Sequence, residues 1–352
     1  MHRANKEYCP WKAAFSTDSD VLQYALPQHK GGTMQPFKNI LLVAEGKPAE
    51  RTALKRAVSL AKMNHAQLTV FSVVKSLPRD VQILITAVPP GELQALAIEK
   101  HREHIEQFIA PLQNEGASVA VKVVAGSPFI QIIRDVLRHN RDLVMITAEE
   151  RKSRLKELLF GSTSMHLMRK CPCPVWVVKP GDGKHYARIL AAVDIGIENR
   201  QTAELADRIV GLAILLARRE RSRLHIVHTW DVWSEGFVRE RAGIPRAEVE
   251  ELMLGIRRMH ESGLRDLLKK HDLRRVPHRV HILKGDPGMI IPKIAERERV
   301  GLIVMGTVGR TGIGGLLIGN TAEKVLRQIN CSVLTAKPEG FVTPVTLDEQ
   351  PD

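Results

Sequence analysis

The sequence predicts an α/β protein made of two tandem domains, each a doubly wound parallel sheet. Three observations support this prediction. The chain has 352 residues, which suits two domains of ordinary size. Apolar runs of strand length alternate with helical patterns, which is typical of parallel sheets covered by helices on both faces. The same series of motifs also occurs twice, so a unit of about 150 residues is duplicated.

The duplication shows in five markers that recur in one order at nearly constant offsets. The first marker, Ile40–Glu45, parallels Ile189–Asp194 at an offset of 149. Two markers have an offset of 159: Gly126–Pro128 with Gly285–Pro287, and Leu143–Ile146 with Leu302–Met305. Two have an offset of 158: Gly161–Thr163 with Gly319–Thr321, and Cys173–Pro180 with Cys331–Pro338. Chance similarity does not produce such a series.

The elements follow from this pattern in chain order. In the first unit we expect strands near 39–44, 67–74, 118–124, 142–147 and 174–179. In the second unit we expect strands near 187–193, 223–229, 278–283, 301–306 and 332–337, and helices near 199–217, 245–271, 287–299 and 320–330. Right-handed crossovers make each sheet doubly wound, and ligands are expected beyond the carboxyl ends of the strands.

The last strands of the two units would each be an open sheet edge. If the units pair about a pseudo-twofold axis, each covers the edge of the other, and one chain forms a pseudo-dimer. The predicted domains are residues 36–180 and 185–338. Residues 1–35 are expected to be an irregular extension, with Met34 as a hypothetical translation start, and residues 339–352 a mobile acidic tail.

Composition narrows the functional classes. Aromatic residues make up only 4% of the chain, which disfavours a single-strand nucleic-acid binder built on stacked rings. No apolar stretch approaches the roughly 20 residues that a membrane helix needs, and no secretory signal is visible. The four cysteines are too few for a disulfide framework, and Cys171 and Cys173 are expected to be buried thiols. These features favour a cytoplasmic protein.

Two groups of charged and titratable residues have competing interpretations. The net charge is +13, and basic clusters occur at Arg218–Arg223 and Lys269–Arg275. They fit either solvated helix ends or a surface for an anionic partner such as nucleic acid or lipid headgroups. His225 and His228 on one strand and His278 and His281 on another are expected to be structural, because no third metal ligand is specified. No catalytic motif is present.

A cluster of glycines follows the fourth strand of the second unit. Gly306 and Gly309 precede Arg310, and Gly319 precedes a helix that is expected to begin at Asn320. Glycines let phosphate oxygens approach backbone N–H groups, and a helix N-terminus favours an anion. The simpler interpretation is a turn followed by a capping box from Asn320 to Glu323.

The spacing Gly306-x2-Gly309-x9-Gly319 resembles the ATP-binding motif of the universal stress protein family. The resemblance extends over residues 36–338, and the run Arg169–Trp176 makes it most similar to the tandem E subgroup. It implies a strand order of 3-2-1-4-5 and an adenine nucleotide held between the first and fourth strands of the second unit.

The same resemblance implies the residues of the site. Asp194 matches the family acid that contacts adenosine, and Thr229 matches the strand position whose backbone meets adenine. The full set of expected ligand-binding residues is Asp194, Thr229, Met305, Gly306, Gly309, Arg310, Gly319, Asn320 and Thr321. Asn320 replaces the usual hydroxyl residue of the family, so we expect weaker binding of phosphate there.

The first unit departs further from the motif. Ala148 and Arg151 occupy the positions of Gly306 and Gly309, and Glu149 with Glu150 would repel a phosphate. Residues 151–160 are expected to form a short amphipathic helix. We therefore expect the first unit not to bind ATP, although Glu45 occupies the position that corresponds to Asp194, where the resemblance places the adenosine.

The expected function is that of a stress-response protein that holds ATP, with or without Mg²⁺, in its second domain. It would act as a regulatory or protective factor and not as a fast enzyme. The alternative is a lipid- or protein-binding adaptor without nucleotide, whose ligand is anionic or apolar. The third hypothesis is an enzyme that catalyses slow ATP hydrolysis or nucleotidyl transfer, and a homodimer of the whole chain is left open.

Overall fold

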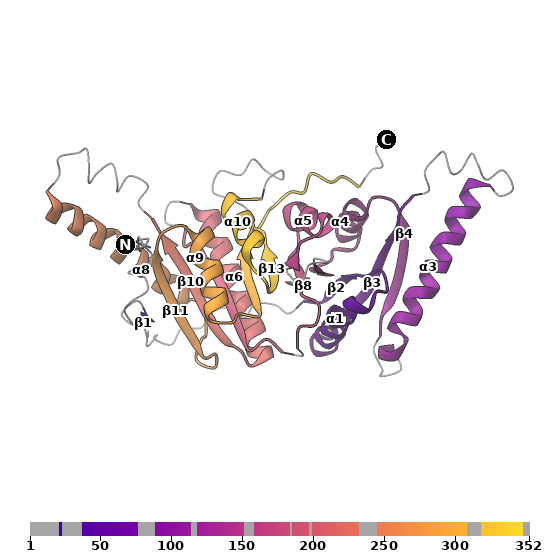
Figure 1. Ribbon diagram of the computed structural model, residues 1–352, viewed down its shortest axis with the longest axis horizontal. Coiled ribbons are helices and arrows are strands. Elements are labelled where there is room, and N and C mark those ends of the chain that lie inside the picture. The colour runs from indigo at the N-terminus through magenta and orange to yellow at the C-terminus, as the bar shows by residue number, and fades with distance from the viewer. Residues whose placement is uncertain are drawn as a thin grey trace, which may run out of the picture.

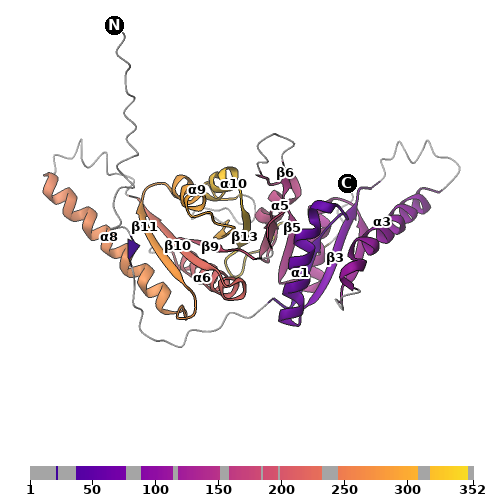
Figure 2. The ribbon, with the colours of Figure 1, turned by 60° about the horizontal axis from the view of Figure 1, so that its bottom comes forward.

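The structure, a computed structural model, describes residues 21–22, 37–76, 89–113, 118–150, 158–183, 185–196, 199–231, 245–307 and 318–347. Figure 1 shows two α/β domains side by side, joined along the middle of the molecule. Figures 1 and 2 both place helices α3 (Pro90–Gln113) and α8 (Arg246–Lys269) at its opposite ends. Within the described residues no helix is long and apolar enough to cross a membrane.

The first domain contains five parallel strands in the order β4-β3-β2-β5-β8. These strands are β2 (Asn39–Val43), β3 (Gln67–Val74), β4 (Ala120–Ala125), β5 (Leu143–Thr147) and β8 (Val175–Val178). The helices between them are α1 (Arg51–Asn64), α3, α4 (Pro128–His139) and α5 (Ser162–Lys170). Numbered within the domain, the strand order is 3-2-1-4-5, as expected.

The second domain repeats this order as β11-β10-β9-β12-β13, again with parallel pairing. Its strands are β9 (Arg188–Val193), β10 (Arg223–Trp230), β11 (His278–Lys284), β12 (Leu302–Gly306) and β13 (Ser332–Ala336). Its helices are α6 (Arg200–Glu220), α8, α9 (Pro287–Arg297) and α10 (Asn320–Gln328). The strand positions agree with those expected from the apolar runs.

The two sheets join through their last strands, which pair antiparallel. Trp176 of β8 lies opposite Leu334 of β13, and Val177 lies opposite Val333. The result is one sheet of 11 strands in which neither last strand is an open edge. The pseudo-dimer expected from the duplication is therefore confirmed, and the pairing protects both edges from other chains.

Alternating side chains on the strands divide the core into two layers. Ile40 and Leu42 face one cluster and Leu41 faces the other, because successive strand residues point to opposite faces. The first cluster contains residues of α1, α3, α6 and α8, and the second contains residues of α4, α5, α9 and α10. Each cluster draws on both domains, so the two domains share their cores.

The repeated Gly-x-Pro marker is explained by the way α4 and α9 begin. Gly126 and Gly285 have φ values of +133° and +126°, a region that favours glycine. The next residue is the N-cap, and proline occupies the first turn, where its missing N–H costs nothing. In α9 the Asp286 carboxylate accepts a hydrogen bond from Gly288 N at 2.8 Å.

Three expectations about irregular segments need correction. Residues 1–35 are not irregular throughout, because β1 (Val21–Leu22) pairs antiparallel with β11. Residues 151–160 do not form one helix, because β7 (Leu158–Leu159) pairs with β6 (Glu149–Glu150); residues 151–157 lie outside the described residues. An apolar pair such as Leu158–Leu159 fits a strand as well as a helix face.

The third correction concerns the acidic tail, which was expected to be mobile. As far as Leu347 it lies across the first domain, where Figure 1 shows it passing from β13 toward α4. Arg134 donates to the Thr346 carbonyl at 3.0 Å, and Arg138 donates to the Leu347 carbonyl at 3.2 Å. The segment that follows β13 thus tethers the second domain to α4 of the first.

Candidate functional site

Those expected site residues that the structure describes lie at the carboxyl ends of three neighbouring strands of the second domain and at the start of α10. In the sheet register His228 of β10 lies opposite Val193 of β9, and Met305 of β12 lies opposite Ala192. Continued by one residue, the register places Asp194 beside Thr229 on one side, and on the other side Gly306 lies opposite Val193, one residue before Asp194. This is the edge where the strand order reverses, the usual ligand position in doubly wound sheets.

Asp194 is fixed in a tight turn. Its Oδ1 accepts a hydrogen bond from Gly196 N at 3.3 Å. Gly196 has φ of +61°, and a Cβ at this position would collide with the backbone nitrogen of Ala203 at the start of α6. Only glycine fits both requirements, so the turn holds the Asp194 carboxylate at the end of β9.

Met305 and Gly306 have packing roles that the glycine motif does not reveal. The Met305 side chain is buried in the core, so only its backbone lies at the strand end. A Cβ on Gly306 would lie 2.7 Å from Leu205 Cδ2 of α6. The absence of a side chain at Gly306 therefore allows α6 to pack closely against β12.

Helix α10 begins at this edge of the sheet. Gly319 is its N-cap, and Gly319 N donates to the Thr307 carbonyl at 2.9 Å, which ties the helix start to the end of β12. Asn320 is the first helical residue and not the N-cap, so the expected capping box from Asn320 to Glu323 is wrong. Gly319, which takes the N-cap position, has no side chain to cap the helix, and Glu323 forms an ion pair with Arg327 at 2.7 Å.

The start of α10 can bind an anion. The first N–H groups of a helix have no partner within the helix, and here they belong to Asn320, Thr321 and Ala322. The side chains of Asn320 and Thr321 are exposed. The positive end of the helix dipole adds a favourable field for phosphate. Gly309 and Arg310 lie outside the described residues.

Sequence reasoning missed two residues behind this edge, Thr307 and Lys337. Both are buried, and Lys337 Nζ donates to Thr307 Oγ1 at 2.6 Å. The available signal was the repeat itself, because Lys337-Pro338 after β13 matches Lys179-Pro180 after β8. The hydrogen-bond partners of Thr307 could not be predicted from the sequence, because its hydroxyl also donates to the carbonyl of Met168, which lies 139 residues away.

Four histidines of the second domain form two contacting pairs. His228 Nδ1 lies 3.0 Å from the Val193 carbonyl, so this nitrogen donates, and neutral His228 then accepts from His260 Nδ1 at 2.8 Å through Nε2. His225 Nδ1 lies 3.1 Å from His281 Nε2. Within the described residues no group of three or more side chains could hold a metal ion.

The matching position in the first domain has a different electrostatic character. Ala148 occupies the place of Gly306 and donates its N–H to the Val178 carbonyl at 2.8 Å. The Glu149 carboxylate lies against Gly161 at the start of α5, where a Cβ would collide with it. A carboxylate already faces this helix N-terminus, which opposes the binding of a second anion.

The adenine side of the first domain also differs. Glu45 is exposed after β2 and forms an ion pair with Lys47. Glu50 Oε2 accepts hydrogen bonds from Glu45 N at 2.9 Å and Lys47 N at 3.0 Å. Burial raises the pKa of Glu50. The turn after β2 is therefore held by the Glu50 carboxylate, whereas in the second domain the Asp194 carboxylate accepts from Gly196 N.

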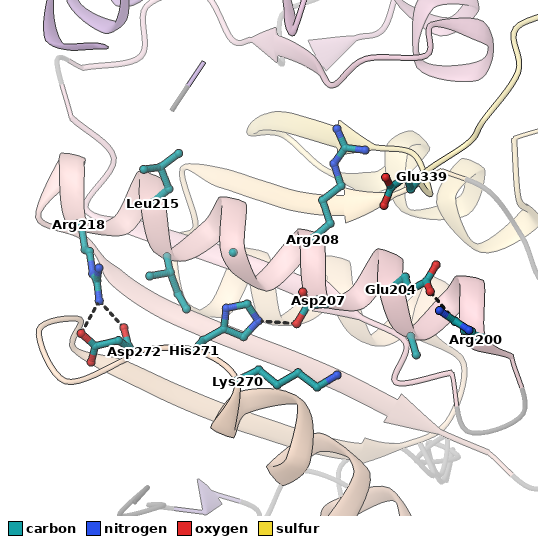
Figure 3. A pocket seen from close by; sticks show the side chains of 13 residues that line it. Arg200, Glu204, Asp207, Arg208, Leu215, Arg218, Lys270, His271, Asp272 and Glu339 are labelled. Carbon is teal, nitrogen blue, oxygen red and sulfur yellow. Dashed lines mark hydrogen bonds and ion pairs between the residues drawn. The ribbon is translucent and has the colours of Figure 1, made fainter. Parts of the chain in front are cut away.

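A groove of about 990 Å³ lies along the exposed side of α6 (Figure 3). Its charges largely pair with one another: Arg200 with Glu204 at 2.8 Å, His271 with Asp207 at 3.0 Å, and Arg218 with Asp272 at 3.1 Å. The two basic clusters of the sequence meet at its Arg218 end. Hydrogen bonds from Arg274 lower the pKa of Asp272 to about 2, so this carboxylate stays charged between them.

Comparison with known proteins is consistent with the duplicated architecture. The model of the universal stress protein family matches residues 36–179 and again residues 185–337. Universal stress protein E of Escherichia coli K12 is 30% identical over 321 residues, which cover 91% of this chain and all of that protein. The homologue from Haemophilus influenzae is 29% identical over 307 residues, 86% of this chain and 98% of that protein.

Two solved structures from Pseudomonas aeruginosa have the same fold along most of the chain. A functionally unknown protein of strain PAO1 gives a TM-score of 0.60 at 25% identity, with 87% of this chain and 95% of that chain covered. A putative universal stress protein of strain UCBPP-PA14 gives 0.62 at 24% identity, with 88% and 96% covered.

Proposed function

Since the chain belongs to the universal stress protein family, as a tandem member with a role in the stress response, we propose that it acts by holding ATP in its second domain. We take residues 36–180 as the first domain and residues 185–338 as the second. ATP binds there with or without Mg²⁺, and the protein serves as a regulatory or protective factor. Its place in the cytoplasm and a homodimer of whole chains remain predictions from the sequence.

The observation that carries the proposal is the contrast between the two matching helix starts. At α10 the N–H groups of Asn320 and Thr321 point from an exposed N-terminus beside the ends of β9 and β12. At α5 the Glu149 carboxylate already lies against Gly161. An anion is favoured at the first position and repelled at the second, which supports one phosphate site per chain.

The adenosine end of the proposed ligand lies beside Asp194 and Thr229. The Asp194 carboxylate can accept hydrogen bonds from ribose hydroxyls, and its turn is fixed before the ligand arrives. Asn320 offers an amide where a hydroxyl is usual in the family, so the backbone N–H groups supply most of the phosphate contacts. This favours moderate affinity.

The proposal is tested by changing one charge at the start of α10. Asn320→Asp has almost the same shape, and an acidic residue in the first turn suits the helix dipole, so the fold is retained. The new carboxylate faces the phosphates, and we expect the Kd for ATP to rise about tenfold or more, equivalent to about 1.4 kcal/mol. Isothermal titration calorimetry measures this change.

Ser162→Asp is the matched control, because Ser162 is the first residue of α5 and has the same helix position in the first domain. It should leave the Kd for ATP unchanged. Equal weakening by both variants would contradict the assignment to the second domain. Failure of the wild type to bind ATP would favour the alternative, an adaptor that binds lipid or protein without nucleotide.

A further inference from the structure

A buried lysine lies directly behind the proposed nucleotide site. Lys337 follows β13, and only 2% of it is exposed. Its Nζ donates to the Arg169 carbonyl oxygen at 2.9 Å and to Thr307 Oγ1 at 2.6 Å. Nζ also lies 4.8 Å from the centre of the Phe341 ring. Among the described residues no carboxylate forms an ion pair with it.

Thr307 connects this lysine to the start of α10. Its hydroxyl has one hydrogen, which it donates to the Met168 carbonyl at 2.9 Å, so it accepts from Lys337. Its own carbonyl accepts from Gly319 N at 2.9 Å. Thr307 therefore links Lys337, through its hydroxyl, to the N-cap of the proposed phosphate-binding helix, through its carbonyl.

The same contacts join the two domains. Met168 and Arg169 belong to α5 of the first domain, whereas Thr307 and Lys337 belong to the second. The carbonyl oxygens at the end of α5 thus hold the residues that support the start of α10. The first domain, although it is not expected to bind ATP, contributes the acceptors that fix this corner of the site.

The network accommodates either protonation state of the lysine. A neutral amine has two N–H groups, which are enough for the Arg169 carbonyl and Thr307 Oγ1; a proton adds a third, which the Phe341 ring can accept as a cation–π contact. Burial lowers the pKa of Lys337 to about 7. Its charge can therefore change near neutral pH without loss of the hydrogen bonds.

The charged groups around Lys337 come from three elements. From α6, Arg208 donates to the Lys337 carbonyl at 3.1 Å. After α5, a Cys171 thiolate would favour the protonated lysine. The Arg169 side chain lies 4.0 Å from Glu323 of α10. Glu339 follows Lys337 in the chain, and its negative charge favours the protonated form of Arg208. The Arg208 contact is to the backbone carbonyl of Lys337, and burial of Nζ is the main cause that disfavours its protonation.

We propose that Lys337 is a positioning residue of the nucleotide site that gains a proton when phosphate binds at the start of α10. This inference rests on the proposed binding of ATP. A bound triphosphate brings several negative charges close to a partly neutral amine in a region of low dielectric, which favours the charged form. The lysine then supports the phosphate electrostatically while Thr307 keeps the helix start in place.

The test is the number of protons taken up when ATP binds. Calorimetric titration at pH 8 in two buffers with different ionisation enthalpies gives this number, and at this pH the terminal phosphate is already ionised. With the pKa of Lys337 at about 7, a tenfold increase in its proton affinity on phosphate binding gives an uptake of about 0.4 of a proton per ATP by the wild type at this pH. No uptake by the wild type would overturn the inference.

Two variants assign the proton to this lysine. Lys337→Met keeps an unbranched side chain that is one atom shorter, and Lys337→Gln keeps hydrogen-bond donors without a titratable group. Both should bind ATP without proton uptake. Lys179→Met is the matched control, because Lys179 follows β8 at the pseudo-symmetric position and donates to Asn330 instead; it should behave as the wild type.

The outcomes separate this inference from the proposed function. ATP binding with the same proton uptake in the wild type and in the Lys337 variants would overturn the role of Lys337 and leave the nucleotide site intact. Absence of ATP binding by the wild type would overturn both. Loss of uptake in the Lys337 variants together with unchanged uptake in Lys179→Met would support the inference.

Discussion

Arg56 and Glu220 form a buried ion pair between the two domains. Arg56 Nη1 lies 3.2 Å from Glu220 Oε1, and the side chains are only 4% and 2% exposed. Arg56 also donates to the Gly183 carbonyl at 2.6 Å, and Glu220 accepts from Tyr186 N at 3.2 Å. Each charge has further hydrogen bonds, which a buried ion needs if it is not to destabilise the fold.

Removal of one partner should therefore be costly. Glu220→Ala leaves the Arg56 guanidinium buried without its carboxylate, and we expect the free energy of unfolding to fall by about 3–5 kcal/mol. Glu204→Ala is the control, because its ion pair with Arg200 is largely exposed and should contribute less than about 1 kcal/mol. Urea denaturation measures both values, and equal losses would contradict the prediction.

At the level of single residues, the structure bears on where the expected site residues lie, and those in a local pattern lie at the expected ends of elements. Asp194 and Gly319 lie where the strand and glycine patterns indicate, at the ends of elements. Thr307 and Lys337 were missed because their partners come from distant parts of the chain, such as Met168. Gly306 was assigned to the ligand, whereas the structure also gives it a packing role against Leu205.

The adjacent strands β10 and β11 carry a buried histidine pair. His225 and His281 stack with ring centres 5.4 Å apart, and His225 Nε2 is buried without a hydrogen-bond partner among the described residues. Burial lowers the pKa of each histidine to about 4, and nearby arginines, Arg279 among them, act in the same direction. Both rings are therefore neutral in the folded protein at neutral pH.

This pair predicts a loss of stability in acid. In the unfolded chain histidine has a pKa of about 6.5, so between about pH 6.5 and pH 4 the unfolded state binds more protons than the folded state. The free energy of unfolding should be highest above pH 6.5 and should fall as the pH drops toward 4. Denaturation at a series of pH values measures the slope.

Variants test whether the histidine pair causes this slope. His225→Phe/His281→Leu removes both titratable rings and should make the slope between pH 6.5 and 4 shallower. His65→Asn is the control, because His65 is exposed and its φ of +50° suits asparagine. A slope in the double variant equal to that of the wild type would contradict the assignment.

At the level of elements, the strands and the helices of the second domain could be predicted because their apolar periodicity is strong. The predictions failed where a short segment had more than one physical solution. Asn320 can cap a helix, but Gly319, with φ of −60° and ψ of 141°, takes the cap position instead. Leu158–Leu159 pairs with a neighbouring strand that no local pattern specifies.

On the scale of the whole molecule, the duplication acts through the pairing of β8 with β13. This pairing covers two strand edges, and the shared cores continue across the junction. The repeat allowed the pseudo-dimer to be predicted from sequence, because two copies of one unit each have the same open edge. The tail contacts of Arg134 and Arg138 were not predictable, since they involve backbone carbonyls.

The isolated second domain should therefore form a homodimer. Residues 185–352 alone would leave β13 without β8, and two copies can pair their β13 strands antiparallel in the same way. Light scattering coupled to size-exclusion chromatography measures the mass. A folded monomer would contradict this account, and Leu334→Pro in the same fragment, which disrupts pairing of the strand, should reduce dimerisation.

The central claim is that each chain holds one adenine nucleotide, in its second domain. The most direct measurement is the identity and amount of nucleotide that acid releases from freshly purified protein, for the wild type, Asn320→Asp and Ser162→Asp. We predict one adenine nucleotide per chain for the wild type and Ser162→Asp, and far less for Asn320→Asp. Two nucleotides per chain, or equal release from all three proteins, would contradict the claim.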